Sequence, residues 1–135
     1  MAIKVSGNTV ITDSKIFYAA HYSDRIVALG NTGTAKNIDL SQGSVFTATL
    51  TGNATLTVQN AYSASTAGSS FILILTNDAT AGRTVAFAGG SFLFGGGIAS
   101  ISRTTTANAV DVWSFFTPNN GTTWYGNLVL SDLQA

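Results

Sequence analysis

The chain has 135 residues, of which 45% are apolar and only 9% are charged, and its six basic residues balance its six acidic residues. A surface without a basic excess excludes the clustered phosphate contacts that hold nucleic acid, so we expect no nucleic-acid partner. Because so little charge keeps copies apart, the composition predicts a homo-oligomer. Without cysteine there is no disulfide or thiolate metal site, and no apolar run approaches the roughly 20 residues of a membrane-spanning helix, so we expect no membrane insertion.

The first residues predict a small β-hairpin, because Ile3 to Val5 and Thr9 to Ile11 flank a Gly-Asn turn. A hairpin this short is marginally stable by itself in water. We therefore expect it to dock on its own body, on a neighbouring copy or in a larger assembly, and we assign residues 1–33 to an N-terminal attachment arm and residues 34–135 to the body. The arm residues expected to make the attachment are Ile3, Val5, Val10 and Ile11.

From Lys36 onward, short β-prone runs alternate with turn clusters at the spacing of an all-β sandwich or barrel. One run, Ser70 to Thr76, is apolar on both faces and predicts a central strand covered by a second sheet or a second subunit. No fixed-period repeat is visible. We predict an all-β protein, an antiparallel β-sandwich of jelly-roll type with a small N-terminal arm or hairpin. Other expected strands are Asn37 to Leu40, Val45 to Leu50, Ala54 to Val58 and Arg83 to Phe87.

The stretch from Gly89 to Gly97 combines glycines with aromatic residues. It lacks the Lys-Ser or Lys-Thr that ends a phosphate-binding loop, and no helical pattern follows it. The glycines therefore indicate turns, bulges or close backbone approach. The apolar side chains between them predict either core packing or a contact between subunits. The candidate oligomer contact consists of Phe92, Leu93 and Phe94.

The stretch from Asp111 to Gly126, D-V-W-S-F-F-T-P-N-N-G-T-T-W-Y-G, predicts two aromatic-rich strands joined by a tight loop. Pro118 fixes its own φ and Gly121 accepts a positive φ, so Thr117 to Thr122 is expected to turn the chain. We expect its rings to lie mainly in the core. The alternative is a ring exposed for stacking on a sugar, with amides binding the hydroxyls. The residues proposed for that glycan contact are Asn119, Asn120, Trp124 and Tyr125.

Side chains able to perform catalysis are few and scattered. The acids are all Asp and occur singly among turns and strand starts, whereas acid-base catalysis by carboxylates needs two of them in one cleft. His21, the only histidine, is accompanied by no nucleophile motif and no identifiable orienting acid. We predict that the protein is not an enzyme, with no catalytic residue, no cofactor and no metal site.

Three stretches of the chain resemble a known family. They are G-S-S-F-I-L-I-L-T-N-D-A-T-A-G-R-T-V-A-F at 68–87, T-T-T-A-N-A-V-D-V-W-S-F-F at 104–116 and G-T-T-W-Y-G at 121–126. In this order they resemble the β-rich modules of fibres and other virion structural proteins of tailed bacteriophages, particularly cyanophages. The opening M-A-I-K-V-S-G-N-T-V-I-T-D-S and the 37–58 stretch are similar to the same proteins.

The resemblance implies a trimeric component of the virion, made in the host cytoplasm and without catalytic residues. We expect from it a short tail-fibre or baseplate-associated protein, with other virion proteins as partners and host-surface glycan as a ligand. Such a protein acts in assembly and in host-surface contact, where several weak sites together gain avidity. Two alternatives remain open: a capsid decoration or cement protein that stabilises the head, and a carbohydrate-binding module.

Overall fold

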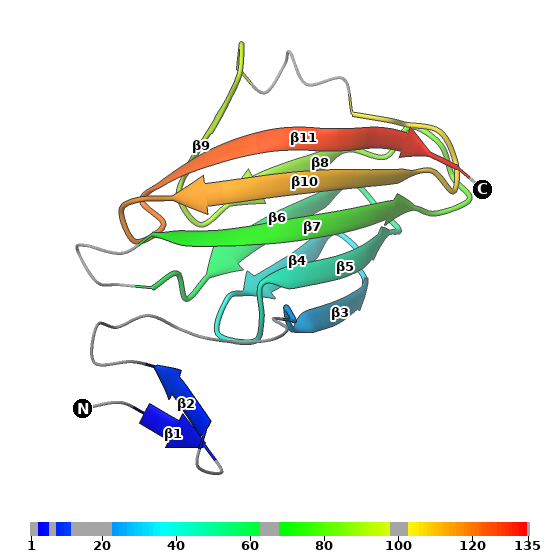
Figure 1. The fold of residues 1–135 in the computed structure, drawn as a ribbon. Helices are drawn as coiled ribbons and strands as arrows, with labels where there is room; N and C mark the ends of the chain where they lie inside the picture. Colours follow the sequence, from blue (N-terminus) through cyan, green and yellow to red (C-terminus); the bar gives the residue numbers. More distant parts are fainter. Residues whose placement is uncertain (1–2, 6–7, 12–22, 63–67, 98–102, 135) are drawn as a thin grey trace.

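The computed structural model describes residues 3–5, 8–11, 23–62, 68–97 and 103–134 (Figure 1). These ranges contain strands, turns and loops but no helix, and thus no helix long and apolar enough to cross a membrane. In chain order the strands are β1 (Ile3–Val5), β2 (Asn8–Ile11), β3 (Ile26–Asn31), β4 (Ala35–Asp39), β5 (Val45–Leu50), β6 (Ala54–Gln59), β7 (Ser69–Asn77), β8 (Val85–Ala88), β9 (Ser91–Phe94), β10 (Val110–Thr117) and β11 (Thr123–Leu133).

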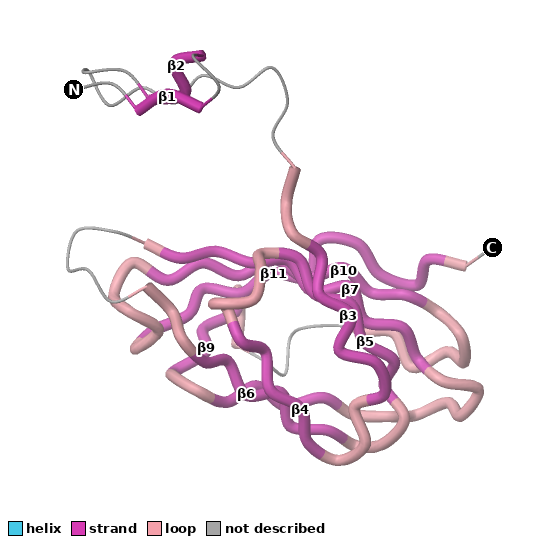
Figure 2. Tube along the Cα trace, turned by 90° about the horizontal axis from the view of Figure 1, so that it is seen from below, coloured by secondary structure: helices cyan, strands magenta, loops and turns pink. Residues whose placement is uncertain are grey.

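Two sheets face each other across the body. The larger sheet has six strands in the order β3-β5-β7-β10-β11-β9, and the smaller has three in the order β4-β6-β8. Figure 2 shows the two layers, with β7, β10 and β11 in one and β4 and β6 in the other. The predicted all-β fold with two sheets is confirmed. Because β3 belongs to the larger sheet, the sheets of the body begin at Ile26, inside the range 1–33 predicted for the arm.

The predicted antiparallel jelly roll is wrong, because much of the pairing is parallel. Strands β3, β5 and β7 run parallel to one another, as do β4, β6 and β8, and β9 runs parallel to β11. Within the two facing sheets, antiparallel pairing is found only between β7 and β10 and between β10 and β11 among the residues that the structure describes. Parallel neighbours need a crossover connection rather than a hairpin. A strand of the opposite sheet provides it between β3 and β5, between β5 and β7, between β4 and β6 and between β6 and β8, whereas β10 of the same sheet connects β9 to β11.

The chain therefore winds through both sheets in coils, from β3 to β4, from β5 to β6 and from β7 to β8. Thr55 pairs with Ala35, 20 residues earlier, whereas Val85 pairs with Ala54, 31 residues earlier. This change in coil length explains why the sequence shows no fixed period. Successive turns stack closely: a Cβ added at Gly52 would lie 2.8 Å from the carbonyl oxygen of Gly33.

The core lies between the sheets and is built by strict alternation along the strands. On β7 the inward side chains Phe71, Leu73 and Leu75 are at most 2% exposed, while Ile72 and Ile74 point outward and are half-buried. The prediction of a strand buried on both faces therefore holds fully for one face only. Each such buried side chain contributes about 1.5–3 kcal/mol relative to an exposed one. The other buried apolar residues of this core are Ile38, Phe46, Ala48, Leu50, Ala54, Leu56, Val58, Phe94, Trp113, Phe115 and Trp124.

The predicted hairpin is confirmed as β10 and β11, which pair antiparallel. Its inward rings join an aromatic cluster in which Phe115 stacks on Phe71, with 4.7 Å between ring centroids. Phe87 and Phe92 bring β8 and β9 into the same cluster, their ring centroids lying 5.5 Å apart. The rings of the hairpin thus pack against side chains of β7, β8 and β9 and connect these strands through one aromatic cluster.

Candidate functional site

The strongest candidate surface is the outer face of the larger sheet, meaning the side turned away from the core. Strand register aligns its side chains in rows: Ile74 lies between Thr47 and Val112, and Ile72 lies between Val45 and Ser114. The face is flanked by exposed apolar residues. Within the described part of the chain, seven of the eight large hydrophobic side chains that are most exposed belong to this sheet, namely Ile26, Leu93, Phe116, Tyr125, Val129, Leu130 and Leu133.

Charge is nearly absent from this sheet. Its six strands contain two charged residues, Asp111 and Asp132, and the Asp111 side chain points inward and is 1% exposed. The outward positions of the smaller sheet are different, since they carry small or polar residues such as Asn37 and Thr55. One side of the sandwich is therefore suited to water and the other to a covering partner.

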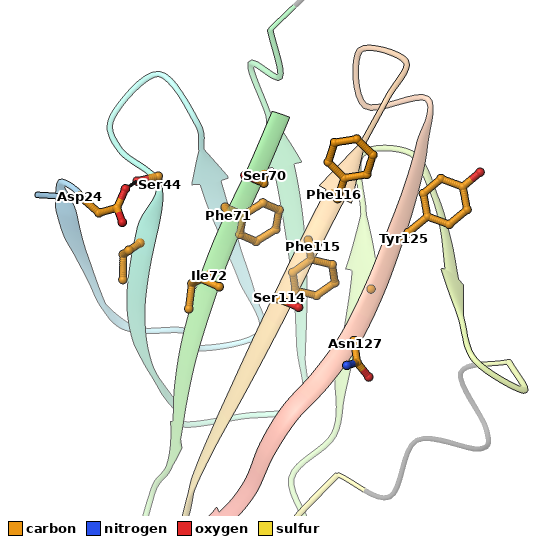
Figure 3. A pocket seen from close by; sticks show the side chains of 12 residues that line it. Asp24, Ser44, Ser70, Phe71, Ile72, Ser114, Phe115, Phe116, Tyr125 and Asn127 are labelled. Atoms are coloured by element: carbon orange, nitrogen blue, oxygen red, sulfur yellow. Dashed lines mark hydrogen bonds between the residues drawn. The ribbon is translucent and has the colours of Figure 1, made fainter. Parts of the chain in front are cut away.

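A shallow groove of about 410 Å³ crosses one end of the outer face (Figure 3). Phe116 and Tyr125 pair across β10 and β11 and are 48% and 52% exposed, so two rings stand side by side at this end. Across β7, the hydroxyl of Ser44 donates a hydrogen bond of 2.7 Å to the Asp24 carboxylate. The remaining polar side chains of the lining are Ser70, Ser114 and Asn127.

The structure separates the four residues proposed for a glycan contact. Trp124 is fully buried and stacks on Phe92, so it offers no ring to a ligand, whereas Tyr125 is exposed in the groove. The side-chain oxygen of Asn119 accepts hydrogen bonds from the Thr123 amide and the Thr117 hydroxyl, and so holds the loop together. Asn120 is exposed with a φ of 58°. The candidate glycan contact therefore keeps Tyr125 and moves to the groove, and Phe116 is the ring that the sequence analysis missed.

The candidate oligomer contact at Phe92, Leu93 and Phe94 alternates along β9. Phe94 is buried and Phe92 packs against the core, whereas Leu93 is 49% exposed. Leu93 pairs with Tyr125 on the neighbouring strand and so extends the outer face to the edge of the sheet. Two of the three side chains serve the core, and one remains available for a contact.

In the arm, the proposed attachment residues Ile3, Val5, Val10 and Ile11 lie on β1 and β2. These strands pair antiparallel, with Ile3 opposite Ile11, so the expected hairpin is present. The structure gives no partner for it, and the attachment role stays a prediction.

A buried polar cluster at the other end of β10 was not anticipated. The Asp111 carboxylate accepts hydrogen bonds from the backbone N–H groups of Thr104 and Asp132, each at 3.2 Å. The Arg103 guanidinium lies 3.7 Å away and also donates to the side chain of Asn77 and to the carbonyl oxygen of Arg83. Burial raises the pKa of Asp111, an effect partly offset by these N–H groups and by Arg103, and burial lowers the pKa of Arg103.

This cluster ties the segment after residue 102 to β7, β10 and β11, so we assign it a structural role. The one signal in the sequence was Asp111 itself, an acid placed at an inward position between the apolar neighbours Val110 and Val112. In the described ranges, no three His, Cys, Asp or Glu residues lie together as they would around a metal ion. His21 lies outside the described residues.

Comparisons with protein-family models, with curated proteins and with solved structures find no match to this chain. The functional proposals below therefore rest on the geometry of the outer face and on the resemblance of the sequence stretches given above.

Proposed function

We propose that this chain is a structural protein of a bacteriophage virion, a short trimeric tail-fibre or baseplate-associated protein that acts in assembly and host-surface contact. The observation that carries the proposal is the concentration of exposed apolar side chains on a larger sheet with almost no charge. Exposed apolar patches of this kind mark surfaces that a partner covers. The sequence resemblance at 68–87, 104–116 and 121–126 supplies the class of assembly.

The position of the protein on particles tests this proposal directly. Virions that carry the chain with a label at its C-terminus are expected to show the label on the tail. A label distributed over the head would replace the fibre proposal with the alternative of a capsid decoration or cement protein. If the chain is not found in purified virions, both proposed virion functions are rejected.

The groove gives a specific reason to keep a carbohydrate-binding module as a second candidate. Exposed aromatic rings stack on the apolar face of a sugar while neighbouring polar groups bind its hydroxyls. Here Phe116 and Tyr125 supply the rings, and Asp24, Ser70 and Asn127 supply polar atoms. Among the residues that the structure describes, the lining contains a carboxylate and no cation, so the ligand that fits is a neutral or amino sugar rather than an acidic one.

A glycan array with the purified chain tests this second function. The variant Tyr125→Ala is expected to lose binding by roughly 10-fold or more if the ring stacks on the sugar, because it removes the buried apolar area of the ring as well as a stacking contribution of about 0.5–1.5 kcal/mol. Tyr62→Ala is the matched control, because Tyr62 is 64% exposed and lies outside this groove. Glycan binding that survives Tyr125→Ala, or no binding by the wild-type chain, would reject the groove as a sugar site.

A further inference from the structure

We infer that the outer face of the larger sheet is covered by the same face of other copies of this chain, three copies meeting around a common axis. The inference rests on the proposed function, because the trimer comes from that proposal, and it adds the surface through which the trimer forms. The occupant of the face is a second copy rather than another virion protein.

The distribution of polarity across the face is that of a protein interface. Ile74 on β7 lies beside Val112 on β10, with Ile72 and Val110 two residues away along the same two strands, which are the middle strands of the sheet. Threonines on β5 and Asn127 on β11 flank this aliphatic centre. An apolar centre with a polar rim is how subunit interfaces are built.

The size of the face also suits a stable subunit interface. The six strands of the sheet are separated by five spacings of about 4.8 Å, and the eight residues of β10 extend by about 3.3 Å each. Together these dimensions give roughly 600 Å² of flat area, before the relief of the side chains is counted. A stable interface covers about 800 Å² on each partner. Side-chain relief adds to this area, and Leu130 and Leu133, which pair with Val112 and Val110, place exposed apolar side chains within it.

Charge favours identical copies as the partner. A partner with a charged surface would leave its charges unpaired against an aliphatic centre that offers none, at a cost in desolvation. The aliphatic centre of a second copy has no charge to desolvate, and β-sheets pack on one another through such aliphatic side chains. Asp24 and Asp132 lie beyond the aliphatic centre, at the ends of β3 and β11, where water reaches them.

Sedimentation equilibrium of the purified full chain at micromolar concentration tests the inference. The wild-type mass is expected to be three times 13.9 kDa. Ile74→Lys places a charge at the centre of the face and is expected to raise the concentration for half-dissociation roughly 30-fold or more. Asn37→Lys adds the same charge on the outward side of the smaller sheet and is expected to leave that concentration within about twofold of wild type.

Far-UV circular dichroism and thermal melting verify that each variant is folded. A second variant, the double substitution Ile72→Thr and Ile74→Thr, removes apolar surface but keeps β-branched residues that suit a strand. It is expected to weaken association in the same direction, so a failure of Ile74→Lys to fold does not leave the inference without a test.

The outcomes separate the surface from the function. If the Ile74→Lys and double-threonine variants stay folded and trimeric, the outer face is not the interface, although the virion function stands. A monomeric wild type whose folded Ile74→Lys variant is lost from particles, while Asn37→Lys is incorporated, would overturn the second copy as occupant and assign the face to another virion protein. If purified particles do not contain the wild-type chain, the virion function is rejected. Dissociation of the trimer by Ile74→Lys but not by Asn37→Lys would still support the outer face as the interface.

Discussion

The Asp111 carboxylate and the Arg103 guanidinium lie together inside one end of the sandwich, with 3.7 Å between Asp111 Oδ2 and Arg103 Nε. Their side chains are 1% and 10% exposed, and two backbone N–H groups also depend on the carboxylate as their acceptor. A buried charge that loses its partner is strongly destabilising, since neither water nor another group replaces it. The pair therefore holds residues 103–106 and the end of β11 against the core.

Asp111→Ala is expected to lower the free energy of unfolding by about 2–4 kcal/mol, because it leaves the Arg103 charge without its opposite charge and two N–H groups without their acceptor. Urea unfolding followed by circular dichroism measures the change. Asp24→Ala is the control: Asp24 is exposed and, among the described residues, accepts a hydrogen bond from Ser44, so a loss within about 1 kcal/mol is expected. Equal losses in the two variants would contradict the structural role of the cluster.

Acid is expected to affect Asp78→Asn and Asp111→Asn in opposite directions. The hydrogen bond from Arg83 lowers the pKa of Asp78 below 3.8, so the stability that it contributes is present above 3.8 and is lost as the pH falls through its folded-state pKa. Burial raises the pKa of Asp111, so its contribution is present below 3.8 and is lost as the pH rises through its folded-state pKa. Each substitution removes one of these two contributions.

Urea midpoints measured from about pH 6 down to about pH 3 provide the readout. Compared with wild type, Asp78→Asn is expected to lose less stability over this range, and Asp111→Asn is expected to lose more. The same loss in both variants and in the wild type would show that neither carboxyl has the shifted pKa that its contacts imply.

The sequence was sufficient to predict most of the strands, though not β3 or β9, and it did not predict the strand directions. Runs of β-prone residues predicted β5 and β7, and the turn residues of 117–122 predicted the β10–β11 hairpin. The prediction of strand direction was wrong at turns such as Thr51-Gly52-Asn53. The same residue types occur in hairpins and in turns that carry the chain to the opposite sheet. Only long-range pairing, such as Thr55 with Ala35, separates the two cases.

The candidate surface was likewise predicted only in part. The apolar stretch at Ser70 to Thr76 indicated that a second sheet or subunit covers both sides of its strand, and the structure places the smaller sheet on one side only. Trp124 and Tyr125 are neighbours in the sequence, yet one is fully buried and the other is 52% exposed. The presence of an aromatic ring does not distinguish them. Neighbouring residues of a strand point to opposite faces of the sheet, and which face is the inner one depends on the sheet that covers it.

Gly126→Ala is expected to destabilise the protein by about 1–3 kcal/mol through overpacking. A Cβ at this position would overlap the Phe94 ring and lie 2.8 Å from Cε1 of Phe115, and both rings are held by the aromatic cluster. Gly95→Ala is the matched control, because a Cβ there meets no atom within 4 Å. Thermal and urea unfolding compare the two variants, and a Gly126→Ala protein as stable as Gly95→Ala would show that the rings can move aside.

Thr117 fixes the loop between β10 and β11 through its hydroxyl. That oxygen accepts hydrogen bonds from the amides of Gly121 at 3.0 Å and Asn119 at 3.3 Å, and the side chain is fully buried. Thr117→Val keeps the shape but leaves both amides without this acceptor, so we expect a loss of about 1–3 kcal/mol in urea unfolding. Thr117→Ser keeps the hydroxyl and should retain more stability than Thr117→Val, because it loses only one methyl group. If Thr117→Val proved the more stable of the two, the methyl contacts rather than the hydrogen bonds would hold this loop.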